Sequence, residues 1–231
     1  MATDRIAGDK AENVRTQRLG VMGGTFDPIH YGHLVAAEMA RNEFNLEKVL
    51  FVPTGNPPHK SGRRISPASL RYEMVKRSLA DNPFFDISPL EIERNGPSYT
   101  VDTLRQLRRE WPDYELYFIT GMDALREIFT WHESEEILNL THFIGASRPG
   151  FEAGDFLIKS QHENPQALHK IHLLEVPALA ISSTDIRVRV AAEKSIRYLL
   201  PENVRQFIEE NALYTPTRIA HTRNESTLGK R

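Results

Sequence analysis

The stretch GGTFDPIHYGH, residues Gly23 to His33, decides the fold, because it ends one strand and opens one helix. The apolar run LGVMGG over residues 19–24 predicts a strand that its two glycines stop. The spacing of apolar residues that follows predicts a helix over residues 32–44. A strand, a short loop and a helix in this order predict the first half of a βαβ unit.

The same alternation of strand and helix continues along the chain. Further strands are expected over residues 48–54, 85–93, 115–120, 141–147 and 172–177, and helices over residues 67–79, 100–111, 133–140, 151–162, 183–192 and 201–211. Ser66 and Pro67 are the expected N-cap and first residue of the second helix. We therefore expect an α/β fold, with a Rossmann-like, mostly parallel sheet, helices on both faces and a small C-terminal helical part. In such sheets ligands bind beyond the carboxyl ends of the strands.

The composition is that of a globular protein and excludes several function classes. The 231 residues are 40% hydrophobic and 26% charged, with a formal net charge of −2. This balance gives no argument for a nucleic-acid or membrane partner, and no apolar stretch approaches the roughly 18 residues of a membrane span. The chain has no cysteine, which removes thiol catalysis and disulfides and fits a reducing compartment, so we expect a cytoplasmic protein.

One folded domain is expected between two polar ends. Residues 1–18 show no apolar period and no apolar segment of the kind found in secretory signals, so we expect a flexible extension. Residues 19–214 carry the strand and helix pattern and are expected to form the domain. Residues 215–231 are polar and mainly basic, which predicts a second flexible segment.

The loop after the first strand has the chemistry of a phosphate site. Gly23 and Gly24 let the backbone approach a ligand, and Thr25 adds a hydroxyl. His30 and His33 stand three residues apart at a helix start, where free N–H groups and the helix dipole favour phosphate. A plain glycine turn, two surface histidines and two metal ligands are the alternatives, but no cysteine or suitably spaced third ligand supports a metal. The complete string favours phosphate.

Five more motifs follow, most of them at the ends of later strands. They are VPTGNPPHK (52–60), GPSYTVDTL (96–104), FITGMDAL (118–125), SRPGF (147–151) and ISSTDIR (181–187). In the last, Ser182, Ser183 and Thr184 are good N-cap residues. Arg187 lies one turn further, so hydroxyls, N–H groups and a guanidinium could converge on one anion. The alternative is an ordinary capped helix with a solvated arginine.

Residues 59–77 are the most basic part of the chain. The six cations are Lys60, Arg63, Arg64, Arg71, Lys76 and Arg77. A charge run of this kind is usually a solvated face. The preceding Asn-Pro-Pro, residues 56–58, stiffens the loop, however, and would aim Lys60 inward.

The motifs together carry a resemblance. GTFDP (residues 24–28) followed by HYGH (residues 30–33) resembles the signature of the nucleotidylyltransferase superfamily, which joins a nucleoside triphosphate to a phosphate-bearing acceptor and releases pyrophosphate. With the later motifs, residues 19–214 are similar to the bacterial nicotinate mononucleotide adenylyltransferases. This implies a nucleotidylyltransferase domain that makes nicotinate adenine dinucleotide from ATP and nicotinate mononucleotide in NAD biosynthesis. One departure is Glu193-Lys194, which replaces an expected glycine-containing turn.

The resemblance also implies roles for individual residues. The implied catalytic residues are Thr25, His30, His33, Lys60 and Arg187. The implied ATP-binding residues are Gly23, Gly24, Thr25, Phe26, His30, His33, Gly121, Asp123, Arg148, Ser182, Ser183, Thr184 and Arg187. The implied acceptor-binding residues are Lys60, Tyr99, Thr100 and Trp131, with the indole stacked on the pyridine ring. Mg²⁺ would be carried with ATP rather than held in a protein metal site.

Some alternatives remain open. An ordinary buried tryptophan is the alternative for Trp131, and a helix N-cap for Asp123. Phosphopantetheine adenylyltransferase, or a nucleotide-sensing module without turnover, could share the first loop, but SYTVDTL and Trp131 disfavour the former and the intact phosphate-binding set the latter. The expected partners are ATP and nicotinate mononucleotide, with no nucleic acid or membrane, and a homo-oligomer stays open.

Overall fold

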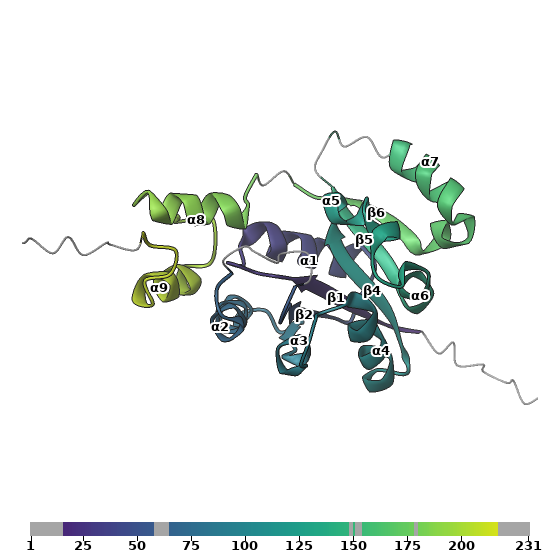
Figure 1. The fold of residues 1–231 in the computed structure, drawn as a ribbon, viewed down its shortest axis with the longest axis horizontal. Coiled ribbons are helices and arrows are strands. Elements are labelled where there is room, and N and C mark those ends of the chain that lie inside the picture. Colours follow the sequence, from purple (N-terminus) through teal and green to yellow (C-terminus); the bar gives the residue numbers. More distant parts are fainter. Residues whose placement is uncertain (1–15, 58–64, 148–149, 151–153, 178–179, 217–231) are drawn as a thin grey trace, which may run out of the picture.

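A six-stranded parallel sheet between two layers of helices forms the centre of the molecule (Figure 1). The computed structural model describes residues 16–57, 65–147, 150, 154–177 and 180–216. The strands are β1 (Gln17–Gly24), β2 (Lys48–Pro53), β3 (Phe85–Ile87), β4 (Tyr114–Gly121), β5 (His142–Ser147) and β6 (Ile171–Glu175). Their order is β3-β2-β1-β4-β5-β6, and all neighbours are parallel. The expected Rossmann-like fold is confirmed, and the strand order reverses between β1 and β4, where such sheets bind ligands.

Helices cover both faces of the sheet. They are α1 (Tyr31–Glu43), α2 (Ala68–Ser78), α3 (Leu90–Glu93), α4 (Thr100–Glu110), α5 (Met122–Leu125), α6 (Ser134–Leu140), α7 (Gly154–Glu163), α8 (Ser183–Ala191) and α9 (Glu202–Glu210), with 3₁₀ turns η2 (Ile128–Thr130) and η3 (Pro165–Lys170). One apolar cluster joins the sheet to α1, α2, α8 and α9, and the other joins it to α3, α4, α5, α6 and α7. In Figure 1, α1 and α4 lie on opposite sides of the sheet.

Strand β1 supplies side chains to both layers, because successive side chains of a strand point to opposite faces. Leu19 and Val21 belong to the α4 cluster and Met22 to the α1 cluster. Gly20 faces the α1 side, where an added Cβ would lie 2.9 Å from the Leu46 side chain. The glycine therefore lets α1 and its following loop pack closely on the centre of the sheet.

The strand expected over residues 85–93 is wrong beyond its first part. Only Phe85–Ile87 pairs with β2, and Leu90–Glu93 forms the short helix α3. Pro89 is the N-cap of that helix, where its fixed φ and missing N–H are tolerated. Leu90 and Glu91 are both buried, and adjacent buried residues fit a helix turn rather than a half-exposed strand.

The expected start of the second helix is also wrong by one residue. Pro67 is the N-cap, with no side-chain cap from Ser66, and α2 begins at Ala68. The backbone N–H of Ser66 donates to Asp27 Oδ2 at 3.2 Å, and its carbonyl accepts from Arg71 Nε at 2.9 Å. Ser66 is thus held by tertiary hydrogen bonds rather than used as a cap.

The domain begins earlier than residue 19, where the sequence predicts its start. Gln17 and Arg18, expected in a flexible extension, belong to β1 and pair with Tyr114 and Glu115 of β4. Residues 1–15 and 217–231 of the expected extensions lie outside the described residues. The connection after α8 lacks a glycine, and Glu193 itself adopts the left-handed conformation with φ 54°.

Candidate active site

Two cavities flank the carboxyl end of β1, at the strand-order reversal. Each has a volume of about 300 Å³. The first lies toward α1 and β5, and the second toward α4 and the segment after η2. They share Gly23 of β1 and Thr120 of β4. Two ligands bound side by side would therefore meet over the end of β1.

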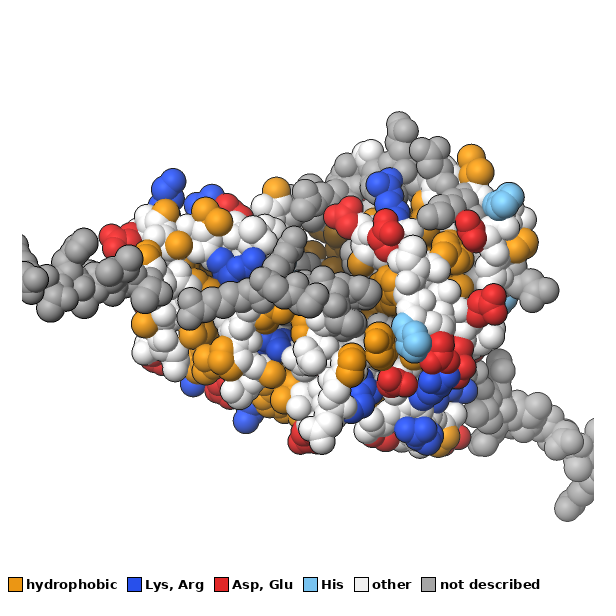
Figure 2. Space-filling model, viewed as in Figure 1, with side chains coloured by type: hydrophobic (Ala, Val, Ile, Leu, Met, Phe, Trp, Pro, Cys, Tyr) orange, Lys and Arg blue, Asp and Glu red, His pale blue; other side chains and the backbone are white. Residues whose placement is uncertain are grey.

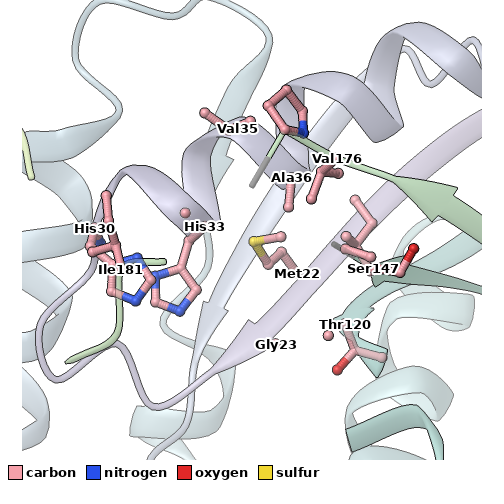
Figure 3. Close-up of a pocket in the computed structure, with 15 residues that line it drawn as sticks. Met22, Gly23, His30, His33, Val35, Ala36, Thr120, Ser147, Val176 and Ile181 are labelled. Carbon is pink, nitrogen blue, oxygen red and sulfur yellow. The ribbon is translucent and has the colours of Figure 1, made fainter. Parts of the chain in front are cut away.

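The first cavity is bordered by the two histidines of the signature (Figure 3). The rings of His30 and His33 stack with centroids 3.8 Å apart, and Figure 3 shows them together on one side of the cavity, with Thr120 and Ser147 on the other. Gly32 lines the same cavity, and an added Cβ would lie 3.0 Å from the His30 ring. The glycine of H-x-G-H thus leaves room for the stacked imidazoles.

Both histidines are neutral near pH 7. Burial lowers the pKa of His30 to about 4, and burial together with His30 lowers the pKa of His33 well below its usual range. The backbone N–H of His30 donates to His33 Nδ1 at 3.3 Å, so the neutral His33 ring carries its proton on Nε2. Nδ1 of His30 is buried and has no hydrogen-bond partner among the described residues. Both rings border the cavity and carry an N–H group that can donate to phosphoryl oxygens.

The start of α8 docks on the loop after β1. Ser182 is the N-cap, and its hydroxyl accepts from Asp185 N–H at 3.1 Å. The Ser183 hydroxyl donates to the carbonyl of Pro28 at 2.8 Å, and Arg187 Nη1 donates to the carbonyl of Asp27 at 2.7 Å. Segments about 155 residues apart in sequence are thus brought together.

Aromatic side chains line the second cavity. The indole of Trp131 packs edge-on against Phe118 and Phe143, with centroids 6.1 and 6.2 Å away, and stays partly exposed to the cavity. Tyr99 is the N-cap of α4 and Thr100 its first residue, so a helix start, which carries free N–H groups, borders the same cavity. The arrangement can hold a flat ring beside an anionic substituent.

Surface ion pairs tie the Trp131 segment to α4. Arg105 Nη2 donates to Glu133 at 2.6 Å and to Glu136 at 2.7 Å. Figure 2 shows acidic and basic side chains next to one another over this part of the surface, near α4 and α6. Exposed pairs contribute little individually, but a guanidinium shared by two carboxylates fixes one segment relative to the other.

Several expected site residues lie away from the cavities or beyond the described part. Gly23, Gly121, His30 and His33 border the first cavity, whereas Gly24 and Thr25 border the second. Six expected residues border neither cavity: Phe26, which is buried in the core, Asp123, which is exposed in α5, and Ser182, Ser183, Thr184 and Arg187, beside the first loop. Lys60 and Arg148 lie outside the described residues.

Sequence reasoning missed a buried acid, Glu91, in the second cavity. It is 7% exposed, and its Oε1 accepts from the Thr103 hydroxyl at 2.7 Å. Its Oε2 has no partner among the described residues, and burial raises the pKa of Glu91. His132, also missed, lies against Tyr99 with ring centroids 4.4 Å apart. Glu91 was missed because the alternation in residues 85–93 predicted a strand, whereas Glu91 lies in the short helix α3.

Sequence reasoning also misassigned one cation. Arg71 was placed in a solvated charge run, but it is 1% exposed and donates to the carbonyls of Thr25, Gly55 and Ser66 at 2.8, 3.2 and 2.9 Å. Tyr214, from the far end of the chain, was not singled out, and its hydroxyl donates to Asp27. No local pattern marks either residue, because both act over long sequence separations.

The described residues show neither a metal-ligand cluster nor a membrane-spanning helix. Within them, no group of three or more histidine, aspartate or glutamate side chains is arranged to hold a metal ion. No helix among them has the length and apolar character that crossing a membrane requires.

Comparison with known proteins matches most of the chain. The model of the cytidylyltransferase-like family matches residues 21–189. A "probable nicotinate-nucleotide adenylyltransferase" of Desulfitobacterium hafniense (strain DSM 10664 / DCB-2) is 63% identical over 202 residues, which cover 87% of this chain and 98% of the relative. The protein of the same description from Moorella thermoacetica is 55% identical over 204 residues, with 87% and 94% covered.

Solved structures share the fold. Plasmodium falciparum nicotinic acid mononucleotide adenylyltransferase, complexed with NaAD, superposes with a TM-score of 0.70 over 86% of this chain and 97% of that chain, at 21% sequence identity. The same protein complexed with APC gives a TM-score of 0.69. The six-stranded sheet and its helices are thus those of these structures.

Proposed function

The chain belongs to the cytidylyltransferase-like family and, within it, to the nicotinate-nucleotide adenylyltransferases, and from this premise we propose its reaction. An oxygen of the 5′-phosphate of nicotinate mononucleotide attacks the α-phosphorus of ATP. The bond from that phosphorus to the bridging oxygen of the β-phosphate breaks, and pyrophosphate leaves. The product is nicotinate adenine dinucleotide, a step of NAD biosynthesis.

The observation that carries this proposal is the shared wall of the two cavities. Gly23 and Thr120 border both. ATP in the first cavity and the acceptor in the second would bring the α-phosphorus and the attacking phosphate together over the end of β1. A nucleotide-binding module without turnover would need one cavity, whereas joining two nucleotides needs two that meet.

We assign the phosphate contacts to the first loop and to α8. Both reactants are anionic, so the reaction needs positioning and charge stabilisation rather than a general base. The neutral rings of His30 and His33 would donate to phosphoryl oxygens, joined by the backbone N–H groups of Gly24 and Thr25. Arg187 would add a positive charge from α8. We further assign Phe26, Ser182, Ser183 and Thr184 to ATP binding, Gly121, Asp123 and Arg148 to the adenosine part of ATP, and Lys60 to catalysis and to the acceptor.

We assign the second cavity to the pyridine nucleotide. Trp131 offers a flat surface for the pyridine ring. The start of α4, at Tyr99 and Thr100, offers free N–H groups for a 3-carboxylate. An anion there would also be favoured by the helix dipole.

Mg²⁺ would come with ATP, bound to triphosphate oxygens and water, which is how this small cation is usually held beside phosphates. It would neutralise charge that the protein cations do not reach. We further propose that residues 17–214 form the catalytic domain, because β1 begins at Gln17 rather than at residue 19. The absence of cysteine in the chain and the biosynthetic reaction favour a reducing compartment, the cytoplasm.

A pyrophosphate-release assay tests the proposed function. The full chain, ATP and Mg²⁺ are incubated with nicotinate mononucleotide, with phosphopantetheine, or with no acceptor. We expect pyrophosphate to be released only when nicotinate mononucleotide is the acceptor. Release with phosphopantetheine alone would assign the chain to a different transferase, and tight ATP binding without release under any condition would indicate a nucleotide sensor.

A further inference from the structure

One buried carboxylate organises the loop after β1. Asp27 is 5% exposed. Its Oδ1 accepts from the Tyr214 hydroxyl at 2.7 Å, and its Oδ2 accepts from the Ser66 backbone N–H at 3.2 Å. Buried carboxylates need such donors, and losing one leaves an unpaired oxygen in the interior. The two donors therefore fix where this side chain, and the loop backbone that carries it, can lie.

Arg71 holds the same loop from a second side. Arg71 is 1% exposed, and its guanidinium donates to the carbonyls of Thr25, in the β1–α1 connection, and of Gly55 and Ser66, at the two ends of the β2–α2 connection. The nearby Asp27 carboxylate partly offsets the effect of burial, which lowers the pKa of Arg71. A planar guanidinium can serve three carbonyls in fixed directions, whereas a lysine ammonium cannot.

The loop passes this restraint on to Arg187. The backbone carbonyl of Asp27 accepts from Arg187 Nη1 at 2.7 Å, and Thr184 Oγ1 accepts from Arg187 Nη2 at 3.1 Å. The residue whose side chain is held by Tyr214 thus orients, through its carbonyl, the cation assigned to the phosphates. Any shift of Asp27 would move the guanidinium of Arg187 with it.

We propose that Tyr214 and Arg71 are positioning residues for adenylyl transfer, which act through Asp27 and Thr25 on the placement of Arg187 and of the phosphate-binding loop. This inference rests on the proposed function. Transition-state stabilisation depends on donors held within a fraction of an ångström. Tyr214 stays a donor throughout the assay range, because burial and the Asp27 carboxylate raise the pKa of its hydroxyl.

Tyr214→Phe is the direct test, because it removes one hydroxyl and keeps the ring. Tyr198→Phe is the matched control, since Tyr198 is 82% exposed. We expect Tyr214→Phe to lower kcat with ATP and nicotinate mononucleotide by about 10-fold, with KM changed by less than about 2-fold, as for loss of stabilisation specific to the transition state. Tyr198→Phe should match the unchanged protein. Circular dichroism and thermal melting establish that each variant is folded at the assay temperature.

A double-mutant cycle separates positioning from general stability. If Tyr214 acts through Arg187, Tyr214→Phe should lower kcat by no more than about 2-fold in an Arg187→Lys background. If the two substitutions act independently, the kcat of the double variant should fall by the product of the two single losses. Should Tyr214→Phe fail to fold, Arg71→Lys takes its place in the same cycle, with the same expected loss and the same coupling.

The outcomes are distinguishable. An unchanged protein that makes no dinucleotide overturns the proposed function, and this inference with it. If the wild-type protein is active and the folded Tyr214→Phe variant has the same kcat, this inference alone is overturned. So does a fully multiplicative loss in the cycle.

Discussion

Two stacked histidine pairs lie at opposite ends of the parallel strands, and burial shifts the pKa of both pairs in the same direction. We call the side where the strands end the carboxyl edge of the sheet, and the side where they begin the amino edge. At the carboxyl edge, His30 and His33 stack at 3.8 Å. At the amino edge, His142 Nδ1 and His172 Nε2 are 3.1 Å apart. Burial lowers the pKa of all four imidazoles. A depressed histidine pKa therefore reports burial in this molecule and does not by itself mark a site.

The two pairs differ in what surrounds them. His30 and His33 border a cavity and a helix start, and Nδ1 of His30 lacks a partner among the described residues. His142 and His172 stack instead on Tyr117, with Phe44 and Arg18 alongside. Parallel sheets bind ligands at their carboxyl edges. Position in the fold, rather than titration, separates the pair proposed to act in catalysis from the other pair.

Removing one imidazole from each pair gives the largest expected difference. His33→Ala should lower kcat by about 10²-fold or more, because it deletes one preorganised donor to the transferring phosphoryl group. His172→Ala should leave kcat within about 2-fold, since variants away from the site act through stability. Steady-state rates at saturating ATP and nicotinate mononucleotide, on variants folded by circular dichroism, provide the measurement. Equal losses would erase the distinction between the edges.

The acceptor preference sharpens what the carboxyl edge recognises. A carboxylate accepts hydrogen bonds only, whereas an amide must also donate, and the start of α4 at Tyr99 and Thr100 offers donors. We expect kcat/KM for nicotinate mononucleotide to exceed that for nicotinamide mononucleotide by at least about 10²-fold. Parallel measurements at fixed ATP and Mg²⁺ decide this. A preference for the amide would point to Glu91, the buried acceptor that lines the same cavity.

Acid unfolding compares the pairs by stability. Burial lowers the pKa of His30 in the folded state to about 4, so the folded state favours the neutral ring over the charged one. The contribution of the neutral ring to the free energy of unfolding is fully present above the pKa of the unfolded state, near 6.5. It is lost as pH falls toward 4, by about 3 kcal/mol in all. Urea unfolding from pH 7 to 4.5 should therefore show a shallower decline for His30→Gln than for the unchanged protein. His142→Gln, at a partly exposed position, should change the slope less, and a larger change there would contradict the ranking.

Truncation should have the smallest effect. Residues 1–9 and 220–231 lack apolar periodicity, so their removal should leave kcat and melting temperature nearly unchanged. Thermal melting and the pyrophosphate assay on the shortened chain test this. A marked fall in melting temperature would show that a terminal segment packs on the rest of the protein and that the proposed domain of residues 17–214 is too short.

The carboxyl-edge pair could be predicted from the sequence because its chemistry is local. GGTFDPIHYGH contains the strand end, the loop and the helix start in one stretch, and contiguous strand and helix patterns likewise predicted the parallel sheet. Trp131, Tyr99 and Thr100 follow the same logic, since each stands next to a predicted strand or helix end. The cavity they share needed the tertiary structure.

The remaining parts could not be predicted because they depend on partners far along the chain. Arg71 looks like one more cation in a basic run until three carbonyls surround it. Tyr214 meets Asp27 across 187 residues. The alternation in residues 85–93 hid a helix turn and the burial of Glu91, because a short apolar pattern fits either element.

Product formation tests the central claim most directly. The full chain is mixed with ATP, Mg²⁺ and nicotinate mononucleotide, and both pyrophosphate and the dinucleotide are quantified by chromatography and mass spectrometry, with His33→Ala in parallel. The account predicts equal amounts of nicotinate adenine dinucleotide and pyrophosphate, formed far more slowly by the variant. Pyrophosphate without the dinucleotide, or the same product at the same rate from His33→Ala, would contradict it.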